Sequence, residues 1–181
     1  MAKATKPHTQ VGEDYLAIAK GKPAIVHKFP FPAKAVWAAL LDAKAWTEWL
    51  PITKVTWTSG RPFGKGTTRT VEVGSQVVEE TFFAWEDGKR MAFRFERSTL
   101  PVSAAVEDYT VVEVPGGCEL QWWGRASAGS AELASVPALA PAPSVAPAAA
   151  RAGRAQSGDR ALKDRKSTRL NSSHSSVSRM P

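Results

Sequence analysis

The sequence has few of the residues that build covalent or metal-bound frameworks, because its 181 residues include 1 cysteine and 3 histidines. The single Cys118 excludes an internal disulfide and a cysteine-based zinc site. His8, His27 and His174 lack the spacing of metal ligands, and the sequence indicates no serine–histidine–aspartate arrangement. We therefore predict no catalytic residue, no metal and no cofactor from these residue types.

Long apolar stretches are also absent. No run of about 18 consecutive apolar residues occurs, so we expect no membrane-spanning helix. The first 15 residues mix Lys, His, Gln and Glu without an apolar centre, which differs from a secretory signal. These absences favour a cytoplasmic protein.

Aromatic residues are missing from the last 58 residues, since all 7 Trp, 7 Phe and 2 Tyr lie at or before Trp123. A segment without aromatics cannot build much core. The net charge of +7 is divided at the same place: residues 1–123 hold 15 Lys and Arg against 14 Asp and Glu, and residues 124–181 hold 9 against 3. The near-neutral charge of the domain argues against nucleic acid as its partner. Binding of nucleic acid or of a protein partner by the basic tail is an alternative function that we do not favour.

The end of the chain reads as foreign sequence. Residues 164–174 are similar to one translated frame of a widely used short-read sequencing adapter. Residues 175–177 fall at the variable index of that adapter, and residues 178–181 match the constant sequence after it. We interpret residues 164–181 as an adapter artefact without function.

Residues 124–163 are rich in Ala and Pro, a composition typical of a disordered linker. We favour a second interpretation, in which the reading frame is shifted near Gly124. When the reading frame moves by one base, an Ala codon (GCN) that is followed by a codon beginning with G is read as CNG. CNG encodes Leu, Arg, Gln or Pro. The first three are good helix formers, so this segment can be the wrong frame of an amphipathic helix.

Residues 22–123 are expected to form the folded domain, preceded by a polar and aperiodic segment, residues 1–21, that predicts a flexible N-terminal arm. Residues 24–31 predict a first strand that ends in proline. Residues 32–46 begin with proline and carry apolar residues at helical spacing, and residues 45–50 predict a short second helix.

Six strand-like runs follow, and the short turns between them indicate an antiparallel meander. Alternation such as Met91, Phe93 and Phe95 against Arg94 and Glu96 gives the sheet one apolar face and one wet face. The runs are 52–58, 67–73, 76–85, 90–97, 105–114 and 118–123. The predicted fold class is α+β, with about seven antiparallel strands and two short helices after strand one. Two short helices cannot cover such a sheet, so we expect a long C-terminal helix that is lost after about residue 123.

Four segments carry a resemblance to a known family. They are PFPAKAVWAALLDAKAWTEWLP (30–51), GKGTTRTVEV (64–73), EETFFAWEDGKRMAFRFE (79–96) and PGGCELQWW (115–123). Together they resemble the SRPBCC helix-grip superfamily of START-like domains and polyketide cyclases or dehydrases. The resemblance departs at Gly124, where the long helix of the family should begin. It implies a deep cavity between the sheet and that helix, and a protein that binds a small apolar molecule.

The predicted cavity lining comes from the second helix and the apolar face of the sheet. Ligand pockets are mostly apolar, and a simple filled core is the alternative for each residue. The candidates are Trp49, Val71, Val73, Phe83, Met91, Phe93, Phe95, Tyr109, Leu120 and Trp122.

Glu79 and Glu80 are neighbours on a predicted strand, so one of the two side chains points to the apolar face. A carboxylate there would have a raised pKa and could act as a general acid or base. The main prediction is ligand binding without a defined reaction. The alternative is a cyclase- or dehydratase-type enzyme that uses Glu79 or Glu80 with Tyr109, and Asp108 is a further acid–base candidate.

Overall fold

The computed structural model describes residues 4–17, 23, 25–128 and 131–133. They form an α+β fold built on one antiparallel sheet. The elements are β1 (Lys6–Pro7), α1 (Glu13–Ala17), β2 (Ile25–Phe29), α2 (Ala33–Leu40), α3 (Ala43–Trp49), β3 (Lys54–Trp57), β4 (Thr68–Val73), β5 (Gln76–Glu86), β6 (Arg90–Ser98), β7 (Ala104–Val114), β8 (Gly117–Ala128) and β9 (Ala131–Leu133).

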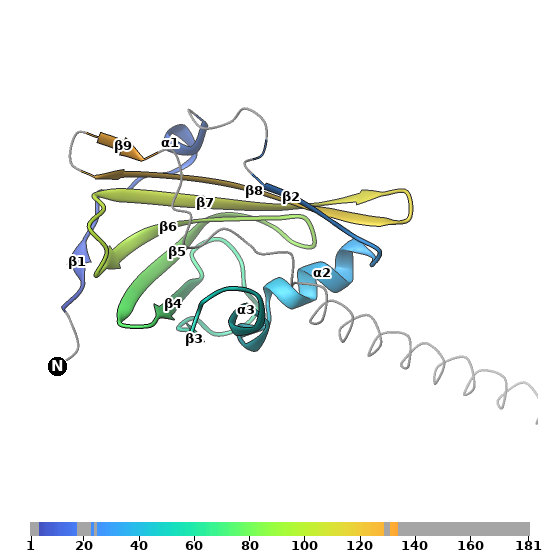
Figure 1. The fold of residues 1–181 in the computed structure, drawn as a ribbon, viewed down its shortest axis with the longest axis horizontal. Coiled ribbons are helices and arrows are strands. Elements are labelled where there is room, and N and C mark those ends of the chain that lie inside the picture. Colours follow the sequence, from blue (N-terminus) through green and yellow to red (C-terminus); the bar gives the residue numbers. More distant parts are fainter. Residues whose placement is uncertain (1–3, 18–22, 24, 129–130, 134–181) are drawn as a thin grey trace, which may run out of the picture.

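The main strands follow the order β2-β8-β7-β6-β5-β4-β3, and the short β1 and β9 pair with β6 and β8 (Figure 1). Strands β3 to β8 form the predicted meander, whereas β2 crosses to the far edge and pairs with β8. The α+β class, the sheet of about seven strands and the two short helices after the first long strand are therefore confirmed.

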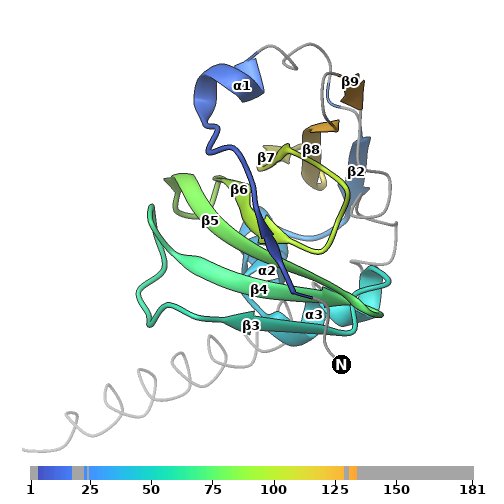
Figure 2. The ribbon, with the colours of Figure 1, turned by 90° about the vertical axis from the view of Figure 1, so that its left-hand side faces the viewer.

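Helices α2 and α3 begin at residues that favour helix starts. Pro32 is the N-cap residue of α2, and the carboxylate of Asp42 accepts a hydrogen bond from the backbone N–H of Lys44 at 2.9 Å to cap α3. The two helices lie on one face of the sheet, which we call the inner face, and α1 lies on the opposite, outer face (Figures 1 and 2).

The larger hydrophobic cluster fills the inner face beneath α2 and α3. A second, smaller cluster lies on the outer face, where Leu16 of α1 is fully buried against Ala92 and Val106. The sheet therefore has apolar patches on both faces, and the N-terminal segment covers the outer one.

This coverage differs from the flexible arm predicted for residues 1–21. Within the described residues 4–17, β1 pairs with β6, and Arg125 donates a hydrogen bond to the carbonyl of Tyr15 at 2.9 Å. The sequence does not signal this docking, because a single buried leucine in a polar segment produces no periodicity.

The sheet also extends beyond the predicted end of the domain at Trp123. Strand β8 continues through Gly124 to Ala128, and β9 pairs with its end. The expected long C-terminal helix and our interpretations of residues 134–163 and 164–181 lie outside the described residues. Within the described part of the chain, no helix is long and apolar enough to span a membrane.

Candidate functional site

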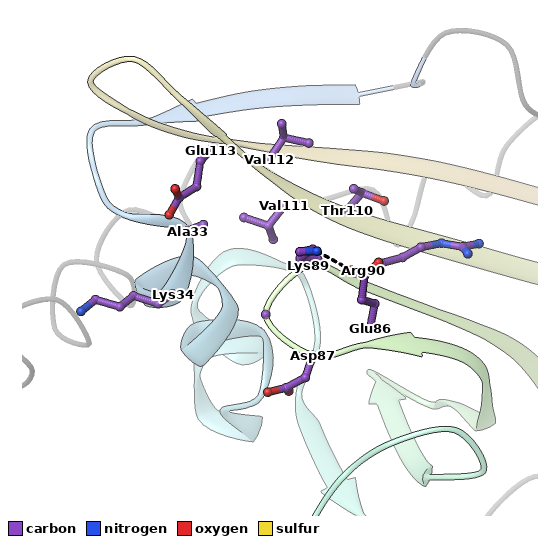
Figure 3. Close-up of a pocket in the computed structure, with 11 residues that line it drawn as sticks. Ala33, Lys34, Glu86, Asp87, Lys89, Arg90, Thr110, Val111, Val112 and Glu113 are labelled. Carbon is purple, nitrogen blue, oxygen red and sulfur yellow. Dashed lines mark hydrogen bonds and ion pairs between the residues drawn. The ribbon is translucent and has the colours of Figure 1, made fainter.

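An open groove of about 660 Å³ lies where α2 begins, between the β5–β6 turn and the end of β7 (Figure 3). Several of its charged groups already have partners, because Lys89 pairs with Glu86 and Arg90 with Asp108. None of the ten predicted cavity residues lines this groove. The residues that line it are Ala33, Lys34, Glu86, Asp87, Gly88, Lys89, Arg90, Thr110, Val111, Val112 and Glu113.

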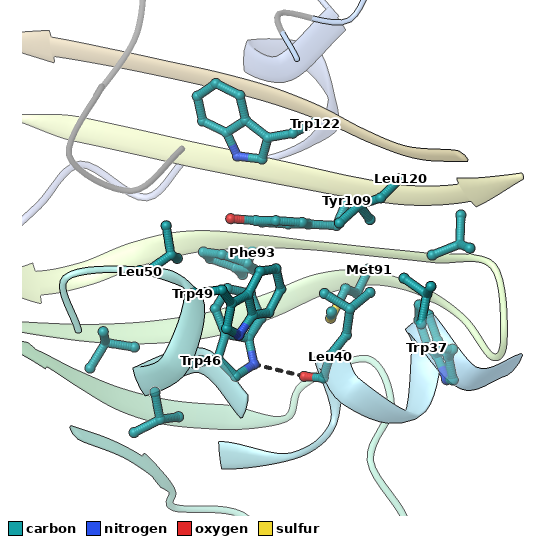
Figure 4. Close-up of a cluster of buried hydrophobic side chains, with 14 of the residues drawn as sticks. Trp37, Leu40, Trp46, Trp49, Leu50, Met91, Phe93, Tyr109, Leu120 and Trp122 are labelled. Atoms are coloured by element: carbon teal, nitrogen blue, oxygen red, sulfur yellow. Dashed lines mark hydrogen bonds between the residues drawn. The ribbon is translucent and has the colours of Figure 1, made fainter. Parts of the chain in front are cut away.

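The predicted cavity residues gather instead on the inner face (Figure 4). Most are fully buried, and Val73 is partly buried at the edge of the cluster. Those brought together are Trp49, Val71, Val73, Met91, Phe93, Phe95, Tyr109, Leu120 and Trp122.

The prediction that Phe83 belongs to the inner-face lining is wrong, because its side chain packs in the outer cluster. The pairing of β5 with β6 shifts between Phe82 and Ala84, and such a bulge reverses the alternation of side chains. Regular alternation along β5 would place Phe83 on the same face as Trp85, which is the inner face. Because of the bulge, Phe82 is the residue that lies on the inner face.

Aromatic rings connect α3 to the sheet. The ring centroid of Trp46 lies 4.7 Å from that of Trp49 and 5.5 Å from that of Tyr109. The indole N–H of Trp46 donates to the carbonyl of Leu40 at 2.8 Å, which fixes the ring against the sheet (Figure 4). This packing makes α3 one wall of the inner-face cluster.

A buried ion pair lies inside this aromatic cluster. Nε of Arg69 on β4 donates to Oε2 of Glu80 on β5, and both side chains are 2% exposed. The guanidinium carbon of Arg69 also lies 4.3 Å from the ring centroid of Trp46 and 4.5 Å from that of Phe93, which favours the cation. Burial raises the pKa of Glu80, and the charge of Arg69 opposes this shift.

A second carboxyl group, that of Glu107 on β7, lies close to this pair and is 2% exposed. Its Oε2 accepts hydrogen bonds from the hydroxyl of Tyr109 at 2.9 Å and from the indole N–H of Trp122 at 3.1 Å. Burial, reinforced by the negative charge of Glu80, raises the pKa of Glu107 to about 8. Glu107 is therefore largely protonated at neutral pH.

The orientation of Trp122 depends on a glycine two residues further along β8. A Cβ atom added to Gly124 would lie 2.3 Å from Cζ2 of Trp122, so the indole lies over the bare backbone of Gly124. Gly124 is also the register partner of Glu107. The absence of a side chain at this position therefore lets the indole reach the Glu107 carboxyl group.

These polar groups line a small cavity of about 10 Å³, which is room for about one water molecule. Two buried atoms of the cluster, Oε1 of Glu107 and Nη1 of Arg69, have no hydrogen-bond partner among the described residues. The cavity is lined by Trp46, Leu50, Ile52, Arg69, Val71, Glu80, Phe93, Glu107 and Tyr109.

The acid–base candidates from the sequence divide between the two faces. Glu80 is the member of the Glu79–Glu80 pair on the inner face, while Glu79 accepts a hydrogen bond from Thr5 at 3.0 Å. Asp108 lies away from the cavity and pairs with Arg90. Among the described residues, no three His, Cys, Asp or Glu side chains form a group that could hold a metal ion.

Sequence reasoning missed Arg69 and Glu107. Both occupy inward positions of alternating strands, two residues before Val71 and Tyr109 respectively. A charged residue in phase with buried apolar residues is the signal that could have found them.

Comparison with known families identifies the family to which this fold belongs. A family described as polyketide cyclase / dehydrase and lipid transport matches residues 25–165. The chain belongs to this family.

Individual relatives add little about activity. Uncharacterized proteins of Mycobacterium bovis and Mycobacterium tuberculosis are 57% identical to the chain over 86 residues, which is 46% of this chain and 52% of theirs. The chain thus spans about half the length of the curated relatives it matches. The crystal structure of Ara h 8.0201 is similar with a TM-score of 0.50 and 14% identity, covering 60% of this chain and 78% of that one. This likeness concerns the fold alone.

Proposed function

We propose that this protein binds a small hydrophobic ligand between the inner face of the sheet and its helices, without a defined reaction. Family membership supports this function. The observation that carries the proposal is a polar cluster, Arg69, Glu80 and Glu107, enclosed by aromatic side chains. Few polar groups in an apolar lining are typical of small-molecule sites, where they orient the ligand.

The ligand would need space that the structure fills. Leu50 and Ile52, between α3 and β3, border the small cavity, and both lie outside regular helix or strand. Displacement of this connection would enlarge the cavity without breaking a strand pair of the sheet. We therefore expect binding to be accompanied by movement of residues 50–52, because Thr53 is hydrogen-bonded to the carbonyl of Glu72 on β4.

Titration with the neutral apolar dye N-phenyl-1-naphthylamine tests this proposal. We expect the dye to gain fluorescence with the full-length protein, and Leu50→Phe to weaken its binding by about 5-fold or more, because the larger ring fills the ligand space. Val26→Phe, at an exposed position of β2, is the matched control and should bind as the wild type does. Equal binding by all three proteins would place the dye elsewhere, and no binding would contradict the function for this class of ligand.

A cyclase- or dehydratase-type enzyme on the same fold is the second candidate. Its support is Glu107, whose pKa of about 8 suits a group that donates and accepts protons near neutral pH. The hydroxyl of Tyr109 bonds to this carboxyl group and would orient it. Loss of turnover in Glu107→Gln with unchanged ligand affinity would support the enzyme, and unchanged turnover would exclude Glu107 as its acid or base.

For the C-terminal part we propose that the reading frame is shifted within residues 124–163 and that residues 164–181 derive from an adapter. The fit of Gly124 beneath Trp122 and the pairing of β8 with β7 up to Ser127 support a junction after Ser127. Sequencing genomic DNA past the Trp123 codon tests this. A shifted frame that encodes an amphipathic helix would support it, and an unchanged Ala/Pro-rich frame would refute it.

A further inference from the structure

The hydrogen bonds of Glu107 leave one of its oxygens for another partner. Oε2 already accepts from Tyr109 and Trp122, at 2.9 and 3.1 Å. Oε1 is buried and has no partner within the described residues. In the protonated group the hydrogen therefore belongs on Oε1, because Oε2 is occupied by two donors.

The charges around Glu107 favour this protonated form. The titratable groups that face it are Arg69 of β4, Glu80 of β5 and Tyr109 of its own strand. The neighbouring strands β6 and β8 present Phe93 and Trp122, and α3 presents Trp46, none of which titrates. The positive charge of Arg69 is already matched by Glu80, so a second ionised carboxylate would lack a counter-ion.

Arg69 supplies a second hydrogen-bond donor at the same place. Its Nε bonds to Glu80, while its buried Nη1 has no partner in the described part of the chain. Arg69 and Glu107 line the same small cavity, which has room for about one water-sized atom group. Two unsatisfied donors facing such a space match one acceptor oxygen.

We propose that Arg69 and Glu107 form a single-oxygen site that binds the uncharged carbonyl oxygen of an apolar ligand. The inference rests on the proposed ligand-binding function and specifies the chemistry of the ligand. A carboxylate is disfavoured, because the only guanidinium of the cluster is already paired with Glu80. Carbonyl binding requires the proton of Glu107, so affinity falls as the pH rises through the pKa of this group, about 8 in the unliganded protein.

Two small ligands of the same shape isolate this effect. In acetophenone a carbonyl oxygen occupies the place that a methylene group occupies in α-methylstyrene. Quenching of tryptophan fluorescence in the full-length protein, measured at pH 6.5 and pH 9.5, gives both affinities. We expect acetophenone to bind about 10-fold more tightly than α-methylstyrene at pH 6.5, as one or two buried hydrogen bonds would give. We expect this ratio to approach one at pH 9.5, and benzoate to bind more weakly than acetophenone at both values.

Two substitutions at Glu107 assign the effect to this residue. Glu107→Gln keeps a donor and an acceptor but cannot ionise, so the preference for acetophenone should persist at pH 9.5. Glu107→Leu removes one of the two donors and should lower the preference at both pH values, without a change between them. Glu113→Gln, an exposed position on the same strand, is the control and should retain the wild-type pH profile. If Glu107→Leu fails to fold, the pH profile of Glu107→Gln alone shows whether Glu107 causes the pH-dependent preference for acetophenone.

The outcomes separate the inference from the function on which it rests. If both ligands bind the wild type with equal affinity, the single-oxygen site is refuted and hydrophobic binding stands. If the preference persists at pH 9.5 in the wild type, or if Glu107→Gln retains the wild-type pH profile, the assignment to Glu107 is overturned. If neither ligand binds, the proposed function fails for small aromatic ligands and the inference fails with it.

Discussion

Replacing Glu107 by glutamine should raise the free energy of unfolding relative to that of the wild type, and this gain should be larger at high pH than at low pH. The unfolded chain releases the Glu107 proton near pH 4.5, whereas the folded protein holds it to about pH 8. Between these values the unfolded state binds fewer protons, so the free energy of unfolding of the wild type falls as pH rises. Glutamine keeps both hydrogen bonds to the side chain and removes the titration.

The difference between the two pKa values sets the size of this effect. Each pKa unit corresponds to about 1.4 kcal/mol, so the shift from 4.5 to about 8 gives a ceiling of about 5 kcal/mol. Water that enters the site when the carboxylate ionises lowers this figure, and we expect on the order of 2–3 kcal/mol.

Urea unfolding of both proteins at pH 4.5 and pH 9 measures this effect, because every other titrating group cancels in the comparison. Glu113→Gln on the same strand serves as the control and should track the wild type. If the free-energy difference between Glu107→Gln and the wild type is the same at both pH values, the carboxyl group ionises normally in the folded protein. That result would refute the reasoning on Glu107.

Three further substitutions test the packing that supports the site. Arg69→Met should lower the free energy of unfolding by about 3–5 kcal/mol, because Glu80 loses its buried counter-ion; urea unfolding should show recovery when Glu80→Met is added. Gly124→Ala should displace the indole of Trp122 at a cost of about 1–3 kcal/mol, with a shift in tryptophan emission. Leu16→Ala should cost about 2–3 kcal/mol and speed proteolysis of the N-terminal segment; unchanged proteolysis would contradict its docking on the sheet.

The strands and inner helices could be predicted because their signals are local. Alternation over residues 90–97 and helical spacing after Pro32 depend on neighbours in sequence, and the structure has β6 and α2 there. The prediction failed where one residue changed the phase. The extra residue of β5 turns Phe83 outward, and no local signal marks such a bulge.

The clustering of the apolar inner-face residues could be predicted, but the polar centre of the candidate site could be predicted only in part. Adjacency alone required Glu79 or Glu80 to face inward, and the pairing of Glu80 with Arg69 identifies which one. The role of Glu107 could not be predicted, because one of its hydrogen-bond partners, Trp122, lies 15 residues away on the next strand. Hydrogen bonds between strands depend on register, which a single sequence does not reveal.

The sequence by itself determined the α+β class, the boundaries of most strands and the apolar character of the inner face, because these follow from side-chain periodicity. Only the tertiary structure decided that Arg69, Glu80 and Glu107 share one small cavity and that the N-terminal segment covers the outer face. The raised pKa of Glu107 belongs to this second group. It arises from burial and from charges on separate strands, which come together when the sheet forms and α3 covers it.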